Sequence, residues 1–210
     1  MDLGEAIQIL SSVSKMPSPG PAPAFSQYHL CLALLTIGDN SPIGRIELSR
    51  KLALGEGAAR TIIKRLSQAK IITIMKGGCA LTRRGQRVYK TLRPKLSTVV
   101  PLEARQLALD TSSVAMVIRG AARRVRKGLE QRDAAIRAGA SGACTLVVSK
   151  QRYVMPTADR SEEMSLDDPL VHDLESLLHP KDGDVVTIVS APNRETAEQG
   201  AMAVALELLR

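Results

Sequence analysis

The clearest structural pattern lies in two stretches, Gly44-Arg-Ile-Glu-Leu-Ser-Arg-Lys-Leu52 and, after a tight connection, Gly57-Ala-Ala-Arg-Thr-Ile-Ile-Lys-Arg-Leu-Ser-Gln-Ala69. In the second stretch, four apolar side chains recur at the spacing of one helix face. They are Ala59, Ile62, Ile63 and Leu66. Polar and small residues occupy the opposite face, so the pattern predicts an amphipathic helix with one face free for a partner.

The neighbouring segments complete a recognisable order of elements. A strongly apolar helix is expected over residues 25–37, before the two stretches. A β-branched run with Gly77-Gly78 as its turn predicts a hairpin after them. Thr82 can cap a last helix that runs to about Leu92. This is the order of a winged helix-turn-helix domain, which we place at residues 25–96.

The outward face of the 57–69 helix carries side chains suited to nucleic acid. Arg60 fits a bidentate guanine contact and Gln68 an adenine contact, while Thr61 and Lys64 suit phosphates. We therefore expect binding of double-stranded DNA. The candidate contacts are Arg45, Gly57, Arg60, Thr61, Lys64, Arg65, Gln68, Lys76, Arg83 and Arg84. The alternative is a charged, solvated helix in a protein–protein adaptor.

The charge distribution favours a polyanion partner for the N-terminal half. Residues 1–100 carry 15 Lys and Arg and 5 Asp and Glu, a formal charge of +10; residues 101–210 carry 14 and 16, a charge of −2. Aromatic residues make up only 2% of the chain, which disfavours a single-strand binder that stacks bases on aromatic side chains.

Two groups of residues resemble known families. Gly44–Leu52, Arg60–Leu66 and Leu81-Thr-Arg-Arg-Gly-Gln86 resemble prokaryotic winged-helix transcription regulators. Gly128-Leu-Glu-Gln-Arg-Asp-Ala-Ala-Ile136 and Gly142-Ala-Cys-Thr-Leu-Val147 are similar to the second domain of an archaeal family of uncharacterised winged-helix proteins. The resemblance implies a regulator and brings no established ligand or reaction.

Three further segments are expected beside the winged helix at residues 25–96. Residues 1–24 form an N-terminal helix and a Pro-rich linker, and residues 97–112 form a connection with a helix near 103–109. Strands and helices alternate over 113–210, which predicts an α+β sheet domain, ferredoxin-like or related, for effector binding or dimerisation. Within it, the polar segment 159–168 is expected to be a loop.

Two places in the C-terminal domain are candidate ligand sites. Four consecutive polar side chains begin a helix: Glu130, Gln131, Arg132 and Asp133. They could line a small-molecule pocket or form surface ion pairs. Asn193 and Arg194 lie where a strand meets a helix and could hold an anion, or simply cap that helix. A basic cluster lies between Arg119 and Lys127. It could bind a phosphate group of a ligand, extend the DNA-binding surface, or simply be solvated.

Other classes of function lack their motifs. The sequence has no P-loop, nucleophile elbow, dinucleotide fingerprint or zinc spacing, so we expect no enzyme, cofactor or metal. A metabolic kinase domain fused to the winged helix is the enzyme alternative. Three cysteines far apart predict reduced thiols, and no long apolar run or signal peptide is seen, so a cytoplasmic protein is expected. Regulators of this kind commonly bind two DNA half-sites related by two-fold symmetry, so we expect a homodimer.

Overall fold

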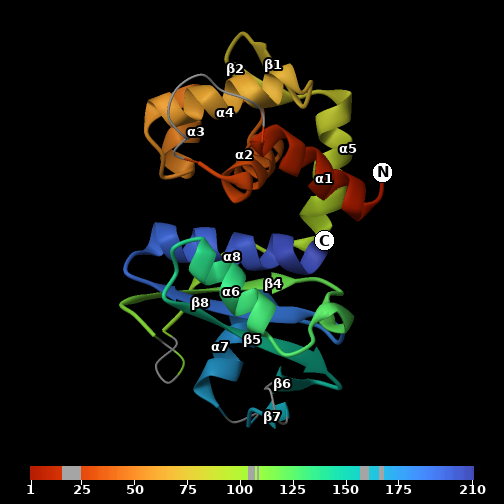
Figure 1. Ribbon diagram of the computed structural model, residues 1–210, viewed down its shortest axis with the longest axis vertical. Helices are drawn as coiled ribbons and strands as arrows, with labels where there is room; N and C mark the ends of the chain where they lie inside the picture. The colour runs from red at the N-terminus through yellow and green to blue at the C-terminus, as the bar shows by residue number, and fades with distance from the viewer. Residues whose placement is uncertain (16–24, 104–106, 108, 157–160, 166–167) are drawn as a thin grey trace. The chain divides into compact units, whose positions relative to one another are not determined.

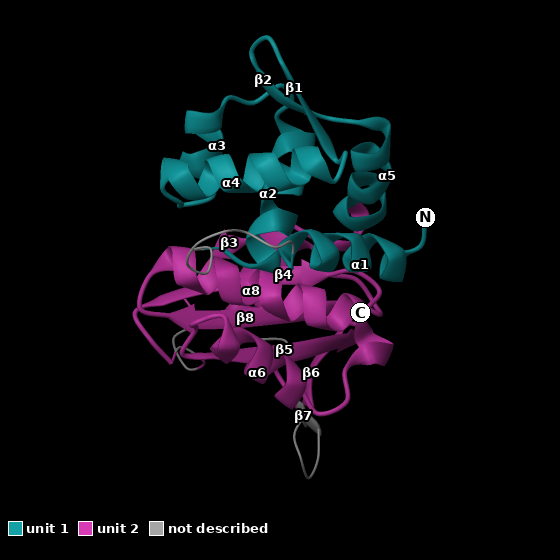
Figure 2. Ribbon diagram, turned by 45° about the horizontal axis from the view of Figure 1, so that its top comes forward, with its two compact units in different colours: residues 1–93 teal, residues 94–210 magenta. Residues whose placement is uncertain are grey.

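The chain divides into two units, residues 1–93 and 94–210, shown in different colours in Figure 2. This computed structural model describes residues 1–15, 25–103, 107, 109–156, 161–165 and 168–210. The division falls at Arg93, three residues before the end of the predicted winged helix. No helix of the described residues is long and apolar enough to span a membrane.

The first unit has the element order expected for the winged helix, preceded in the same unit by the helix predicted within residues 1–24 (Figure 1). Its elements are α1 (Leu3–Ser14), α2 (Gln27–Asp39), α3 (Arg45–Lys51), α4 (Glu56–Gln68), β1 (Ile72–Met75), β2 (Gly78–Leu81) and α5 (Arg83–Leu92). Helix α5 begins as predicted, because the Thr82 side chain accepts a hydrogen bond from the N–H of Gly85 at 3.1 Å.

The four predicted apolar residues of α4 are buried and fix this helix on the core of the unit. Helix α2 is buried over most of its length and forms the centre of that core. Helix α1 adds a second apolar face, with Ala6, Ile7, Leu10 and Val13 buried, and it contacts α2 and α5. The N-terminal helix is therefore part of the core of the first unit.

The wing is a hairpin that an isolated backbone bridge ties to the residue before α3. Its register pairs Met75 with Gly78, so the two-residue turn is Lys76-Gly77; the predicted turn, Gly77-Gly78, was one residue too late. Ile43 and Cys79 exchange backbone hydrogen bonds at 3.1 and 2.8 Å. A Cβ at position 78 would overlap the carbonyl group of Ile43, which explains why glycine begins the return strand.

The second unit is built on a six-stranded antiparallel sheet with the order β3-β4-β8-β5-β6-β7. Its strands are β3 (Val100–Pro101), β4 (Ser112–Ile118), β5 (Gly142–Ser149), β6 (Arg152–Pro156), β7 (Ser161–Glu163) and β8 (Val185–Ala191). Its helices are α6 (Leu129–Arg137), α7 (Pro169–Leu178) and α8 (Arg194–Leu209). Short 3₁₀ turns lie at Arg93–Lys95 and Ala122–Arg124.

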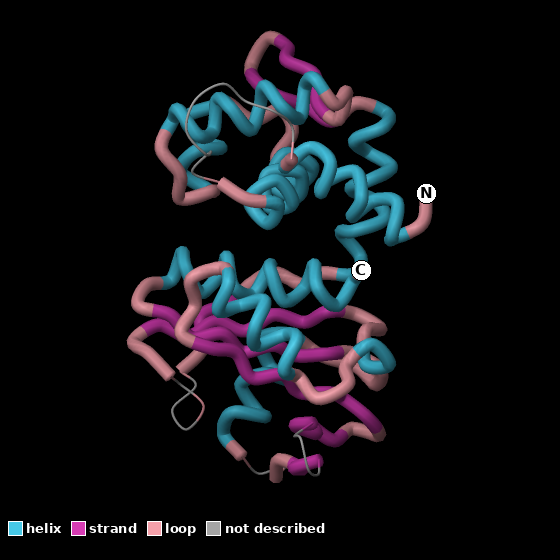
Figure 3. The backbone as a smooth tube through the Cα atoms, in the orientation of Figure 1, coloured by secondary structure: helices cyan, strands magenta, loops and turns pink. Residues whose placement is uncertain are grey.

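Helices cover both faces of this sheet. Figures 1 and 3 show α6 and α8 on one face and α7 on the other. The core beneath α7 combines Leu174 and Leu178 with Val117, Leu146 and Val186 of three strands. On the opposite face, Gly200 of α8 approaches Val189 and the side chains of Ala135 and Ala140 closely.

The ferredoxin-like prediction is therefore wrong, although the α+β class is confirmed. A ferredoxin-like sheet has its first and third strands in the centre and both helices on one face. Here the four strands that would correspond are β4, β5, β6 and β8. The second and the last of these, β5 and β8, are central, and α7 lies on the face opposite α6. The open sheet with two helical layers also differs from the β barrel that the kinase alternative would require.

One predicted connection differs from the structure, and a second lies mostly outside the described residues. The polar segment 159–168 contains a short edge strand, β7, which pairs with β6, so it is not entirely a loop. The helix expected near 103–109 falls mostly outside the described residues; β3 precedes it and pairs with β4.

Candidate nucleic-acid interface and ligand cavity

The outward face of α4 is exposed, as the periodicity predicts. Gly57, Arg60, Lys64 and Gln68 are exposed, and Thr61 is half-buried. Neither Arg60 nor Lys64 forms a hydrogen bond or ion pair with the described part of the chain, so both charged groups are available to an external anion. The Thr61 hydroxyl instead donates to the carbonyl oxygen of Gly57 at 3.0 Å, within the helix.

The other exposed cations of the predicted interface differ in how far they are already paired. Arg45 forms an exposed ion pair with Glu56, with 3.3 Å between Nη2 and Oε2. Arg84 donates from Nη1 to the carbonyl oxygen of Ala69 at 3.1 Å. Lys76, in the wing turn, and Arg83, at the start of α5, are exposed. The structure thus brings Arg60 and Lys64 together on α4, and adds cations from the wing and α5.

Arg65 does not belong to the interface, and the prediction for this residue is wrong. Its side chain is 4% exposed. It donates from Nη1 to the carbonyl oxygen of Ser14 at 2.7 Å, and its guanidinium carbon lies 5.1 Å from the ring centroid of Phe25. Arg65 therefore holds the end of α1 against α4 and is not available to DNA.

The four polar residues at the start of α6 separate onto different faces. Glu130, Arg132 and Asp133 are exposed, whereas Gln131 is 3% exposed and turned inward. The Gln131 Oε1 has no hydrogen-bond partner among the described residues. The four groups therefore do not form one polar pocket, and of the four only Arg132 lines the cavity described below.

The predicted anion site at the start of α8 is a capped helix end. The Asn193 Oδ1 accepts a hydrogen bond from the N–H of Thr196 at 2.9 Å. Arg194 pairs with Glu198, with 2.7 Å between Nε and Oε1. Both side chains already have partners inside the chain, which supports the alternative of an ordinary helix start.

The basic cluster near Arg119 is partly structural. Arg119 pairs with the buried Asp184, with 2.6 Å between Nη1 and Oδ2, and also donates to the carbonyl oxygens of Leu178 and His179. Arg124 donates to the carbonyl oxygen of Leu208. Lys127, by contrast, is exposed and lines the same cavity as Arg132.

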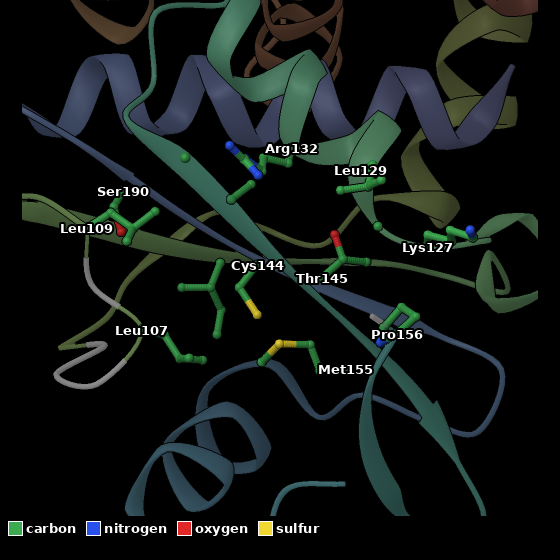
Figure 4. A pocket seen from close by; sticks show the side chains of 14 residues that line it. Leu107, Leu109, Lys127, Leu129, Arg132, Cys144, Thr145, Met155, Pro156 and Ser190 are labelled. Atoms are coloured by element: carbon green, nitrogen blue, oxygen red, sulfur yellow. The ribbon is translucent and has the colours of Figure 1, made fainter. Parts of the chain in front are cut away.

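That cavity, about 270 Å³ in volume, lies between α6, β5 and β6 (Figure 4). Sequence reasoning missed Thr145, a buried polar residue of the cavity that is 4% exposed and whose Oγ1 has no partner among the described residues. Cys144 is the half-buried cysteine of the cavity, and burial raises the pKa of its thiol to about 11. All three cysteines are free thiols, as predicted.

The comparisons with known proteins cover both units. Residues 32–87 match the profile of a family described as PH0730-like, N-terminal domain, and residues 109–208 match a domain of unknown function, DUF4443. No curated protein matches the sequence.

Two solved structures show the extent of the likeness. The hypothetical protein PH0730 from Pyrococcus horikoshii OT3 is 27% identical, with a TM-score of 0.65 over 86% of this chain and 91% of that one. A MarR family protein, Rv2887, from Mycobacterium tuberculosis is 15% identical, with a TM-score of 0.31 over 43% of this chain and 64% of that one. The predicted archaeal resemblance is therefore supported: residues 32–87 are similar to a PH0730-like N-terminal domain, and residues 109–208 to a domain without an assigned function.

Proposed function

We propose that this protein is a transcription regulator that binds double-stranded DNA with α4 of its winged helix-turn-helix unit. The observation that carries the proposal is the division of α4 into two faces. Ala59, Ile62 and Leu66 are buried, while Arg60 and Lys64 are exposed and unpaired among the described residues. Such a helix can enter the major groove without giving up any core contact.

The surrounding charge supports the same function. Lys76 of the wing turn and Arg83 of α5 are exposed cations that can contact phosphates on either side of the groove. The positive charge of the sequence is concentrated in residues 1–100, which contain this unit. Electrostatic attraction to duplex DNA then supplies affinity that is independent of base sequence, and α4 adds the base preference.

We further propose that the second unit senses a small ligand or mediates dimerisation, that it has no catalytic role, and that the protein acts as a cytoplasmic homodimer. A cavity confined to residues of the second unit supports the ligand-sensing role. Two copies would place two α4 helices on half-sites related by two-fold symmetry.

Selection of bound duplexes from a random pool by the full chain tests the proposed function. We expect enrichment of a site with two related half-sites and an affinity that falls steeply as salt is raised. If no duplex is enriched and affinity for random duplexes at low salt is absent, α4 is a protein-docking surface and the adaptor alternative replaces this proposal.

A further inference from the structure

The cavity of the second unit follows from an open edge on β5. Strand β6 pairs only with Val147–Ser149 of β5, and no described strand pairs with residues 142–146 on that side. Continuing the register would place Pro156 opposite Thr145. Proline has no N–H to donate, so the ladder between β5 and β6 ends before it, while β6 pairs with β7 along its other edge.

The open edge leaves backbone groups pointing into the cavity. Hydrogen bonds alternate between the two sides of a strand in an antiparallel sheet. Because the N–H of Val148 donates to Asp184 beside β8, the even-numbered residues of β5 bond toward β8. Ala143 and Thr145 therefore direct their N–H and C=O groups toward the open side, where both residues line the cavity.

The side of the cavity next to α6 holds both of its cations and the unpartnered hydroxyl, together with one apolar side chain, Leu129. Gly128, the N-cap of α6, has a left-handed backbone and gives the helix no side-chain cap. A Cβ there would lie 3.7 Å from the Cβ of Thr145, which places the helix start directly beside that residue. Figure 4 shows the Thr145 hydroxyl directed toward α6. Lys127 and Arg132 line the same side, and the described lining residues include no carboxylate.

The other side of the cavity is apolar. Leu107, Cys144 and Met155 line it and pack against the core beneath α7, to which Ile188 also contributes. Figure 4 shows Leu107 and Met155 on the far side of β5 from Arg132. The cavity thus has its cations and the free hydroxyl on the α6 side of the strand edge, and a larger hydrocarbon surface on the other side.

We propose that this cavity binds a small apolar carboxylate. The carboxylate would lie at the start of α6, where it accepts hydrogen bonds from the Thr145 hydroxyl and from free N–H groups, with Lys127 and Arg132 balancing its charge. The hydrocarbon part would lie against Met155 and Ile188. A volume of 270 Å³ suits a ligand of on the order of ten non-hydrogen atoms. The inference gives a chemical class to the proposed ligand sensing and rests on that part of the proposed function.

The test uses the full chain with ¹³C-methyl methionine and no DNA. Isocaproate and phenylacetate are titrated at millimolar concentrations, each against its neutral amide. We expect a saturable shift of the Met155 methyl resonance, assigned with Met155→Leu, while the resonance of Met116, which is fully buried in β4, stays in place. The amides should bind at least roughly tenfold more weakly, because a carboxylate forms charge-assisted hydrogen bonds.

Matched variants locate the carboxylate. Thr145→Val keeps the shape of the side chain and removes a hydroxyl that has no partner among the described residues, so the chain should fold as before and bind the acids roughly tenfold more weakly. Arg132→Gln and Lys127→Gln should weaken binding as well. Arg123→Gln is the control, because Arg123 is exposed in the 3₁₀ turn before α6 and does not line the cavity.

Each outcome decides the proposal. A saturable Met155 response that prefers acids and weakens in Thr145→Val supports it. No Met155 response to either acid, equal affinity for acid and amide, or full affinity in Thr145→Val overturns it. Duplex binding is measured separately, so a Met155 response in a chain without affinity for DNA would remove the DNA-binding proposal and leave the carboxylate site standing.

Discussion

At the scale of single residues, Arg60 and Lys64 have different expected roles on one exposed face. Replacing either by Ala removes no core contact, so the free energy of unfolding should change by less than about 0.5 kcal/mol. Arg60→Ala should cost about 1–3 kcal/mol on the preferred site and relax base preference at one position. Lys64→Ala should weaken all duplexes alike and lower the salt slope by about one. Equilibrium binding at several salt concentrations measures both.

The control for these two variants is Ile63→Ala on the same helix. Ile63 is buried on the opposite face, so its truncation should cost about 2–5 kcal/mol of stability and reduce DNA binding only through unfolding. Unchanged duplex binding at low salt in both Arg60→Ala and Lys64→Ala would mean that α4 does not contact DNA.

The buried His29 is expected to make the stability of the first unit depend on pH. Burial lowers the pKa of this side chain from 6.5 to about 4, and its Nδ1 accepts a hydrogen bond from the N–H of Ser26 at 3.1 Å. In the unfolded chain His29 takes up a proton below about pH 6.5, whereas in the folded chain it stays neutral down to about pH 4. Stability should therefore fall by up to about 3 kcal/mol as pH decreases through this window. Urea denaturation at a series of pH values measures the loss.

The matched variant is His29→Gln, because glutamine at this helix position can accept the same hydrogen bond and does not titrate. Its unfolding free energy should vary less between pH 6.5 and pH 4 than that of the original chain. Parallel profiles for the two proteins would show that another group controls the acid response.

At the scale of elements, α4 carries two arginines with opposite roles. Arg65→Ala removes a buried hydrogen bond to Ser14 and the contact over Phe25, and it should destabilise the unit by about 2–3 kcal/mol. Arg60→Ala, five residues earlier, is the comparison with no expected loss. Urea unfolding followed by circular dichroism separates the two, and equal stability of Arg65→Ala and the original chain would contradict the structural role of Arg65.

The elements that could be predicted are those with a local signature. Helix α4 follows from its apolar spacing, α5 from the Thr82 cap, and α8 from the Asn193 cap. Burial of Arg65 could not be predicted, because its partners, Ser14 and Phe25, are distant in sequence. The Ile43–Cys79 bridge was missed because a single extended residue has no periodicity.

The polar pocket expected at residues 130–133 does not form, whereas the second unit contains a cavity lined mainly by other residues. Residues 130–133 are adjacent in sequence, but a helix turns consecutive side chains onto different faces. Only Arg132 lines the cavity. Two residues in the sequence could have indicated the cavity: Gly128, which precedes α6, and Pro156, which ends β6. Each interrupts a regular element beside Thr145.

At the scale of the whole molecule, we predict a homodimer in solution. A single winged helix covers few base pairs, and two-fold symmetry would double the contacts. Light scattering of the full chain at high micromolar concentration should give twice the 22.6 kDa mass of one copy. A monomer across the whole concentration range would contradict this, and binding to a single half-site would then be expected.

The order of the strands in the sheet could not be predicted from the sequence. Alternating strands and helices are compatible with several sheet orders, and nothing local places β8 between β4 and β5. The side of the sheet covered by α7 depends on that order. The apolar residues of α7 predict a buried helix but do not indicate which face it covers.

The burial of Tyr153 against the core beneath α7 has a practical consequence for spectroscopy. The chain has no tryptophan, and Tyr153 is the single aromatic residue of residues 94–210; the only phenylalanine and the other two tyrosines, Tyr28 and Tyr89, lie in the first unit. Burial, with a smaller contribution from the charge of Glu175, raises the pKa of Tyr153 to about 12. Tyrosine fluorescence that disappears in Tyr153→Phe thus reports on the second unit alone, without any attached dye.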